Sequence, residues 1–294
     1  MAANEKIFAV DRYDLAATLS SGQAFRWRQR GKNWESVIAG RWVGLQQTDE
    51  GIHARTAVAQ TDWDWLRHYL QTEIDFPAVL ETFPGDAHLT RAKLQCSGLR
   101  LLRQEPWECL ASFILSSTKQ IVQIQQIVAV LCQRFGDSVV VPAGTEPWFA
   151  FPSASRLAGC TESELRECKM GFRAPYLLAA AQMVAGGELD LNALEGRTVT
   201  EARAELIKVH GVGRKIADCV LLFAYGFQAA FPVDVWVMKA LRELYFPKRR
   251  VKQPRLIAFS ETYFGANAGY AQQYLFHYMR TQHPKAKSPS RKAR

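Results

Sequence analysis

The segment at 198–244, TVTEARAELIKVHGVGRKIADCVLLFAYGFQAAFPVDVWVMKALREL, holds the pattern that decides the fold of the helical part of the chain. Thr198 and Glu201 form a capping-box pattern, which predicts the start of a helix. This helix runs into the turn HGVG, and a second helix is expected to begin at about Arg214. The spacing therefore predicts two helices joined by a tight hairpin.

The hairpin carries two glycines, Gly211 and Gly213, around one apolar residue. Glycines allow a sharp turn, and backbone N–H groups at the following helix N-terminus can receive a phosphate. An ordinary turn between helices has the same Gly-x-Gly pattern. Lys215 follows directly, and Cys219 lies four residues on, so both project from one helix face. A lysine acts as a nucleophile only where its pKa is lowered, and by residue type alone Lys215 is more typical of a solvated surface charge.

The sequence FPVDVW at 231–236 marks the start of a further helix. Its proline ends the preceding segment, and Asp234 stands where a side chain can cap the helix VWVMKALREL. A carboxylate at this place would also stabilise a positive charge that develops on a bound substrate. Asp234 is therefore both a predicted cap and a candidate catalytic group.

The rest of the chain divides into a β-rich and a helical part. Between about 7 and 56, turn signals separate the aromatic and β-branched runs AFRWRQR, WESVIAG and RWVGLQQ, which predicts an antiparallel meander. From a predicted cap at Thr61 onward, nearly every segment has helical spacing. We expect an α+β protein with a small antiparallel β-rich N-terminal domain and flanking helices at 1–95, a helical domain at 96–283, and a basic, solvated tail at 284–294.

Composition points to a globular protein with a polyanionic partner. Of the 294 residues, 48% are apolar and 22% are charged, and the formal net charge is +9. Phosphate neutralisation supplies affinity to such a protein, so nucleic acid is the first candidate partner. The six cysteines contain no C-x-x-C pair, which favours neither a metal site nor a disulfide framework. We expect an intracellular, unexported monomer that requires no metal and does not enter a membrane.

The combination of GVGRKIADC with PVDVW resembles the helix-hairpin-helix base-excision glycosylase superfamily. Within it the chain is most similar to the 8-oxoguanine DNA glycosylases of the eukaryotic type, over about residues 20–278. The resemblance implies a bifunctional glycosylase and lyase, without cofactor, that excises oxidised guanine from double-stranded DNA. Lys215 would attack the deoxyribose C1′ and form a Schiff base, and Asp234 would be the catalytic carboxylate. Gly211 and Gly213 would contact DNA phosphates.

The same resemblance implies a pocket for the damaged base. The motif SSGQAFRW places Gly22 where the family presents a backbone carbonyl to the N7 hydrogen of oxidised guanine. The segment GANAGYAQQYLFHY resembles the family's pocket helix, in which Gln272 would meet the Watson–Crick edge and Phe276 would stack on one face. Cys219 would cover the other face. For Cys219 and Phe276, spacing alone favours simple core packing.

A third segment, MGFRAPY, is similar to the one with which the family fills the gap left by the flipped base. Phe172 would wedge into the base stack and Arg173 would read the orphaned cytosine, although a surface Phe-Arg pair needs no such role. The chain departs from the family pattern at Thr118 and Gln123, where asparagines and an arginine are common, and we expect a weaker preference for cytosine. It also has Trp236 where a histidine is common, which removes one phosphate contact.

Two other functions remain open at this stage. The first is a glycosylase for another damaged or mispaired base; those relatives usually carry four clustered cysteines for an iron–sulfur cluster, and no cysteine follows Cys219. The second is a non-enzymatic helix-hairpin-helix protein that only binds DNA. Against it stands the coincidence of a lysine, a carboxylate and the pocket residues Gly22 and Gln272, because binding alone requires no such pocket. The basic tail is expected to add non-specific attraction to DNA.

Overall fold

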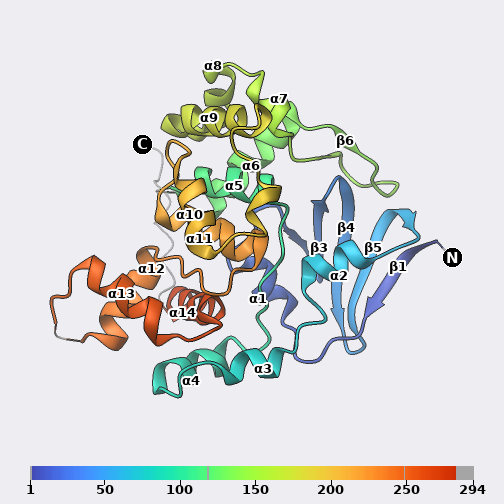
Figure 1. The fold of residues 1–294 in the computed structure, drawn as a ribbon. Helices are drawn as coiled ribbons and strands as arrows, with labels where there is room; N and C mark the ends of the chain where they lie inside the picture. Colours follow the sequence, from blue (N-terminus) through green and yellow to red (C-terminus); the bar gives the residue numbers. More distant parts are fainter. Residues whose placement is uncertain (1, 118, 248, 283–294) are drawn as a thin grey trace, which may run out of the picture.

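The computed structural model describes residues 2–117, 119–247 and 249–282, in which a sheet stands beside a helical body (Figure 1). The N-terminal elements are β1 (Ala3–Phe8), α1 (Leu15–Ser20), β2 (Arg28–Arg30), β3 (Asn33–Ile38), β4 (Arg41–Thr48), β5 (Gly51–Gln60), α2 (Asp64–Leu70), α3 (Phe76–Glu81) and α4 (Ala87–Gln95). The strands pair antiparallel in the order β1-β5-β4-β3-β2. The predicted antiparallel β-rich N-terminal region is confirmed, with β1 added beside β5.

The remainder of the described chain is almost entirely helical, which confirms the α+β class. Its helices are α5 (Pro106–Leu115), α6 (Ile121–Phe135), α7 (Ala154–Ala158), α8 (Glu162–Leu165), α9 (Ala174–Ala185), α10 (Val199–Ile207), α11 (Arg214–Val220), α12 (Val235–Ala240), α13 (Gln253–Tyr263) and α14 (Ala268–Gln282). Single π-helical or 3₁₀ turns lie at Arg166–Met170, Gly171–Arg173, Asn192–Leu194, Leu221–Tyr225 and Leu241–Tyr245. A two-residue ladder of β6 (Ser138–Val139) with β7 (Trp148–Phe149) was not predicted. None of the described helices is long and apolar enough to cross a membrane. The predicted tail, 284–294, lies outside the described residues.

The predicted cap at Thr61 is wrong. Strand β5 runs to Gln60, so the chain still has to turn before a helix can start. Helix α2 begins at Asp64, and the Asp64 N–H donates to Asp62 Oδ1 at 2.8 Å. An aspartate two residues before the helix therefore takes the place of the expected threonine, which is a local contact of the kind that such residues make in turns.

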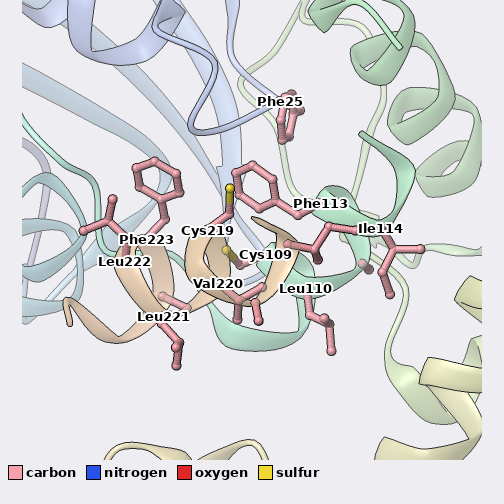
Figure 2. Close-up of a cluster of buried hydrophobic side chains, with 14 of the residues drawn as sticks. Phe25, Cys109, Leu110, Phe113, Ile114, Cys219, Val220, Leu221, Leu222 and Phe223 are labelled. Atoms are coloured by element: carbon pink, nitrogen blue, oxygen red, sulfur yellow. The ribbon is translucent and has the colours of Figure 1, made fainter. Parts of the chain in front are cut away.

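The segment AFRWRQR was predicted as one strand, but only its last three residues pair with β3. Phe25 and Trp27 are both buried, yet they enter different hydrophobic clusters. Trp27 packs in the cluster under the sheet, whereas Phe25 joins the helical core and meets Phe113 edge-on at 5.4 Å between ring centres. Figure 2 shows Phe25 on its separate segment above Phe113 of α5. This segment therefore connects the two parts of the molecule.

The predicted helix-hairpin-helix is present as α10 and α11. Thr198 and Glu201 form the expected capping box, and α11 begins at Arg214 as expected. A buried carboxylate, Asp218 of α11, holds the two helices together. Its oxygens accept from Arg203 of α10 at 2.6 Å and lie 3.5 Å from Arg214 Nε. A buried carboxylate without these cations would strongly destabilise the protein. The contact of Asp218 with Arg203 therefore also fixes the position of α11 relative to α10.

The loop after α1 is attached to the helical body by one buried amide, the side chain of Gln23. Its Nε2 donates to the Arg100 carbonyl at 2.8 Å and to the Thr18 carbonyl at 3.0 Å. Its Oε1 accepts from the Leu102 N–H at 2.7 Å, and its backbone carbonyl accepts from Gln104 Nε2. The donors and the acceptor of the amide are thus all used, and the contacts with Arg100 and Leu102 join segments that are far apart in the sequence.

Replacing Gln23 with alanine should therefore destabilise the protein. Gln23→Ala leaves the Leu102 N–H and the Arg100 carbonyl buried without partners, which should lower the free energy of unfolding by about 3 kcal/mol. Gln29→Ala, in the exposed strand β2, is the matched control and should change it by less than about 0.5 kcal/mol. Urea unfolding followed by circular dichroism measures both. Equal effects of the two substitutions would contradict this account of the loop.

Candidate active site

A cleft of about 1350 Å³ opens between the loop after α1 and the helical body. Parts of α5, α6, α11, α12 and α14 also contribute to its wall. The predicted residues that line it are Gly22, Lys215, Cys219, Asp234, Gln272 and Phe276. These six come from distant parts of the sequence, so the fold brings together every residue that was assigned to catalysis or to the base pocket.

Lys215 stands in the first turn of α11, directly after the hairpin. Its Nζ donates to Ser116 Oγ, at 3.2 Å, and lies 5.2 Å from the centre of the Phe113 ring. The ammonium therefore has a hydroxyl on one side and an aromatic face on another. Such a partly desolvated position is what nucleophilic use of a lysine requires.

Cys219 lies one turn further along α11 and is 3% exposed. Figure 2 shows its sulfur between the side chains of Phe113 and Phe223. Burial raises the pKa of the thiol to about 12, although the nearby Lys215 acts in the opposite direction. Cys219 is therefore a neutral thiol at physiological pH, and it offers a soft, apolar wall rather than a nucleophile.

Asp234 is the N-cap of α12, as the sequence predicts. Its Oδ1 accepts from the backbone N–H groups of Val237 at 2.8 Å and Trp236 at 3.0 Å. Burial raises the pKa of Asp234 above its usual value, and the two backbone hydrogen bonds and the Lys215 charge oppose that shift. The carboxylate is thus held rigidly at the cleft wall within the electrostatic reach of the lysine.

The hairpin itself lies outside the cleft. Gly211 has a φ of +88°, and a Cβ added there would lie 2.5 Å from the Tyr176 ring, so both the conformation and the space require glycine. Gly213 is the N-cap of α11 and has no atom within 4 Å of an added Cβ position. Its backbone is therefore open to an approaching group at a helix N-terminus, as a phosphate contact requires.

Gly22 lies in the loop held by Gln23 and has a φ of +82°. A Cβ on Gly22 would lie 2.6 Å from Ile121 Cδ1 and 3.3 Å from Arg280 Nη1. Any side chain at this position would therefore collide with the cleft wall and be strained by its backbone. Only glycine keeps the backbone of this loop accessible at that wall.

Helix α14 supplies the opposite part of the cleft. Gln272 is 3% exposed, and its Oε1 is buried without a hydrogen-bond partner among the described residues. Phe276, one turn further along, lines the cleft half-buried. An unsatisfied buried acceptor is uncommon in a folded protein. It is explained if a ligand donates to Gln272 when the cleft is occupied.

Phe172 and Arg173 do not line the cleft. Phe172 is 52% exposed, at the end of a tight turn before α9. Arg173 is 1% exposed; its guanidinium donates to the Met170 carbonyl at 3.2 Å and also to the Ser117 carbonyl. The exposed ring suits insertion between bases, whereas the arginine is turned into the protein. Thr118, at which the chain departs from the family pattern, lies outside the described residues.

Among the cleft residues that were not identified from the sequence are Ser116, Phe223 and Arg280. Phe223 lies four residues after Cys219, and Arg280 lies four residues after Phe276. Extending the predicted four-residue spacing by one turn would have found both. Ser116 follows α5 and carries no such signal, because its role depends on Lys215 reaching it from another helix.

Comparison with known proteins places this cleft in a family. Residues 7–110 match the model of the 8-oxoguanine DNA glycosylase N-terminal domain, and residues 111–260 match the HhH-GPD superfamily of base excision DNA repair proteins. The N-glycosylase/DNA lyase of Saccharomyces cerevisiae is 33% identical, over 89% of this chain and 82% of its own. The two family models together span both parts of the fold.

Solved structures agree with these matches. The Clostridium acetobutylicum 8-oxoguanine glycosylase/lyase, in complex with double-stranded DNA containing cytosine opposite 8-oxoguanine, has a TM-score of 0.88 and 30% identity. The match extends over 96% of this chain and 98% of the Clostridium acetobutylicum protein. MBOgg1, in complex with a low affinity DNA ligand, has a TM-score of 0.90 and 31% identity, over 95% of this chain and 96% of its own. The chain belongs to the 8-oxoguanine DNA glycosylase family, within the HhH-GPD superfamily of base excision DNA repair proteins.

Proposed function

We propose that the protein is a bifunctional DNA N-glycosylase and lyase that excises 8-oxoguanine from duplex DNA through a Schiff base on Lys215. The observation that carries this proposal is that Lys215 and Asp234 both line a cleft in which Gln272 has a buried acceptor without a partner among the described residues. Relatives in Saccharomyces cerevisiae and Arabidopsis thaliana are named N-glycosylase/DNA lyases. A substrate of this kind makes the protein DNA-associated within the cell, and because one chain supplies every group, we propose that it acts as a monomer.

Excision requires the damaged nucleotide to leave the base stack. The cost of unpairing and unstacking must be offset by contacts to the flipped base and to the bent duplex. The exposed ring of Phe172 would fill the gap that the flipped base leaves in the stack. The backbone of the hairpin at Gly211 and Gly213 would contact a DNA phosphate. The net charge of +9 supplies the sequence-independent attraction to DNA.

Inside the cleft the base would lie between the Cys219 thiol and the Phe276 ring. The Gly22 carbonyl would accept from N7–H, a hydrogen that oxidised guanine carries and guanine lacks. The buried Gln272 Oε1 would accept from the Watson–Crick edge, which would satisfy a buried acceptor that has no partner among the described residues. Recognition would thus rest on one backbone group and one amide.

The chemistry begins when the Lys215 amine, after loss of a proton, attacks C1′. The bond between C1′ and the base breaks, and its electron pair leaves with the base. Asp234 stabilises the positive charge that develops on the sugar at that moment. The C1′–O4′ bond then opens, O4′ takes a proton, and the resulting Schiff base acidifies C2′. Loss of the C2′ proton expels the 3′ phosphate, which is the lyase step.

The first prediction concerns Lys215. Lys215→Gln removes the nucleophile, so it should abolish both strand cleavage and borohydride trapping on duplexes with 8-oxoguanine, while binding to these duplexes persists. Lys32→Gln, in an exposed turn of the sheet, removes the same charge and should retain both reactions. End-labelled duplexes with the lesion opposite each base in turn provide the measurement. A fully active Lys215→Gln protein would refute the mechanism, and binding by the wild type without cleavage would favour a protein that only binds DNA.

The second prediction concerns Asp234. Asparagine also caps helices, so Asp234→Asn should change the free energy of unfolding by less than about 1 kcal/mol. Loss of the charge should slow base release by about 100- to 1000-fold. Burial raises the pKa of Asp234 above 3.8. When the pH is lowered, the wild-type rate should therefore begin to fall at a pH higher than 3.8. Single-turnover rates against pH test this, and an identical acid limb in Asp234→Asn would assign the titration to another group.

The third prediction concerns the base opposite the lesion. Gln123 is exposed at the cleft rim and accepts from the Gln120 N–H at 3.1 Å, as part of the cap of α6. The wild type should excise 8-oxoguanine opposite the four bases with rates within about tenfold of one another. Gln123→Arg should raise the preference for cytosine by about tenfold. Gln123→Ala controls for loss of the cap, and a cytosine preference that is equal in all three proteins would exclude this residue.

A further inference from the structure

An arginine at the wall of the cleft has no part in the mechanism above. Arg280 lies near the end of α14, one turn beyond Phe276, and lines the cleft. Its Nη2 donates to the Ser20 carbonyl at 3.1 Å. Its Nη1 lies 3.3 Å from the position that a Cβ on Gly22 would occupy. The guanidinium is therefore fixed at one end and placed beside Gly22 at the other.

The inner end of this guanidinium lacks an acceptor. Within the described residues, Nη1 is buried without a hydrogen-bond partner, and no carboxylate forms a salt bridge with Arg280. Partial burial lowers the pKa of Arg280, in agreement with a cation that is partly withdrawn from water and has no anion beside it among the described residues. A buried donor of this kind is costly unless something accepts from it. The Ser20 contact explains the outer end of the side chain but not Nη1.

The position of Nη1 relates it to the proposed base pocket. The Arg280 guanidinium carbon lies 5.9 Å from the centre of the Phe276 ring, on which the base would stack. A base that presents N7–H to the Gly22 carbonyl turns its Hoogsteen edge toward that same wall. On this edge of 8-oxoguanine, N7–H stands between two carbonyl oxygens, O8 and O6. An oxygen therefore lies on each side of the N7–H contact to Gly22, and the unsatisfied Nη1 stands beside the same residue.

We propose that Arg280 is a specificity residue whose Nη1 donates a hydrogen bond to a carbonyl oxygen next to N7–H of the flipped base. The proposal rests on the proposed function and deepens it. Gly22 and Arg280 together form an acceptor and a donor that match the hydrogen and the oxygen on this edge. At O8 the pair distinguishes the oxidised base twice, because guanine has neither the N7 hydrogen nor the C8 oxygen. At O6 it would fix the orientation of the base.

The test compares wild type with Arg280→Met in single-turnover excision from four duplexes. They contain 8-oxoguanine, 8-thioguanine, which has a poorly accepting sulfur in place of O8, 8-oxoadenine, which has an amino group in place of O6, or a preformed abasic site. Loss of a charge-assisted hydrogen bond should slow 8-oxoguanine release by about tenfold to hundredfold. The loss on the abasic duplex, which has no base to contact, should be much smaller.

The analogues identify the oxygen. A small effect of Arg280→Met on 8-thioguanine with a full effect on 8-oxoadenine places the bond at O8, and the reverse result places it at O6. Full effects on both analogues, equal effects on all four duplexes, or no effect would each overturn the proposal. Equal effects would instead assign Arg280 to holding the loop through Ser20.

Two further variants keep the result interpretable. Arg280→Lys retains the charge with a different donor geometry, and its loss on 8-oxoguanine should lie between those of wild type and Arg280→Met. Arg91→Met removes an exposed cation from α4, outside the cleft lining, and controls for the lower net charge. Thermal unfolding of each variant reports its folding. If the wild type leaves 8-oxoguanine in place, the proposed function fails; if only the Arg280 dependence is missing, this inference alone fails.

Discussion

The buried amide of Gln23 is the contact on which the cleft depends. It joins the loop after α1 to the segment between α4 and α5 with every donor and acceptor used, and Phe25 anchors the same loop in the helical core. Gly22 stands between α1 and this anchored pair. Because the loop is tied at Gln23 and Phe25, a backbone carbonyl from the N-terminal part can serve as a wall of a pocket whose other walls are helices. A looser loop would leave the lysine and the carboxylate in an open groove.

Burial then sets the chemical state of the groups that the cleft collects. Burial raises the pKa of the Cys219 thiol, and it also raises the pKa of the Asp234 carboxyl, a shift that two backbone N–H groups and the Lys215 charge oppose. The hydrogen bonds that start α12 therefore also favour the ionised form of the Asp234 carboxylate, against the effect of its burial. The neighbouring lysine gains a counter-charge that water screens poorly. Electrostatic stabilisation is strongest under these conditions.

The two helices that build the cleft each contribute one stripe at four-residue spacing. Along α11 and its continuation the stripe is Lys215, Cys219 and Phe223, and along α14 it is Gln272, Phe276 and Arg280. Each stripe begins with a polar side chain, and the next residue along it, Cys219 in α11 and Phe276 in α14, offers an apolar surface to the cleft. Asp218, on another face of α11, is held by Arg203 of α10. One short helix thus carries Lys215, the proposed nucleophile, on one side and is fixed to α10 on another.

The sequence by itself determined the α+β class, the capping box at Thr198, the start of α11 and the cap at Asp234, because each depends on residues close together in the chain. The motifs also singled out Lys215 and the candidate pocket residues through their resemblance to a family. Sequence could not determine the start of α2 or the extent of the strand after Gly22, since β5 runs on and Phe25 and Trp27 enter separate cores. Only the tertiary structure decided that Ser116 meets Lys215, that Arg173 turns inward and that Arg280 stands beside Gly22. These contacts join residues far apart in the sequence, and local patterns carry no information about which distant side chain will fill a given space.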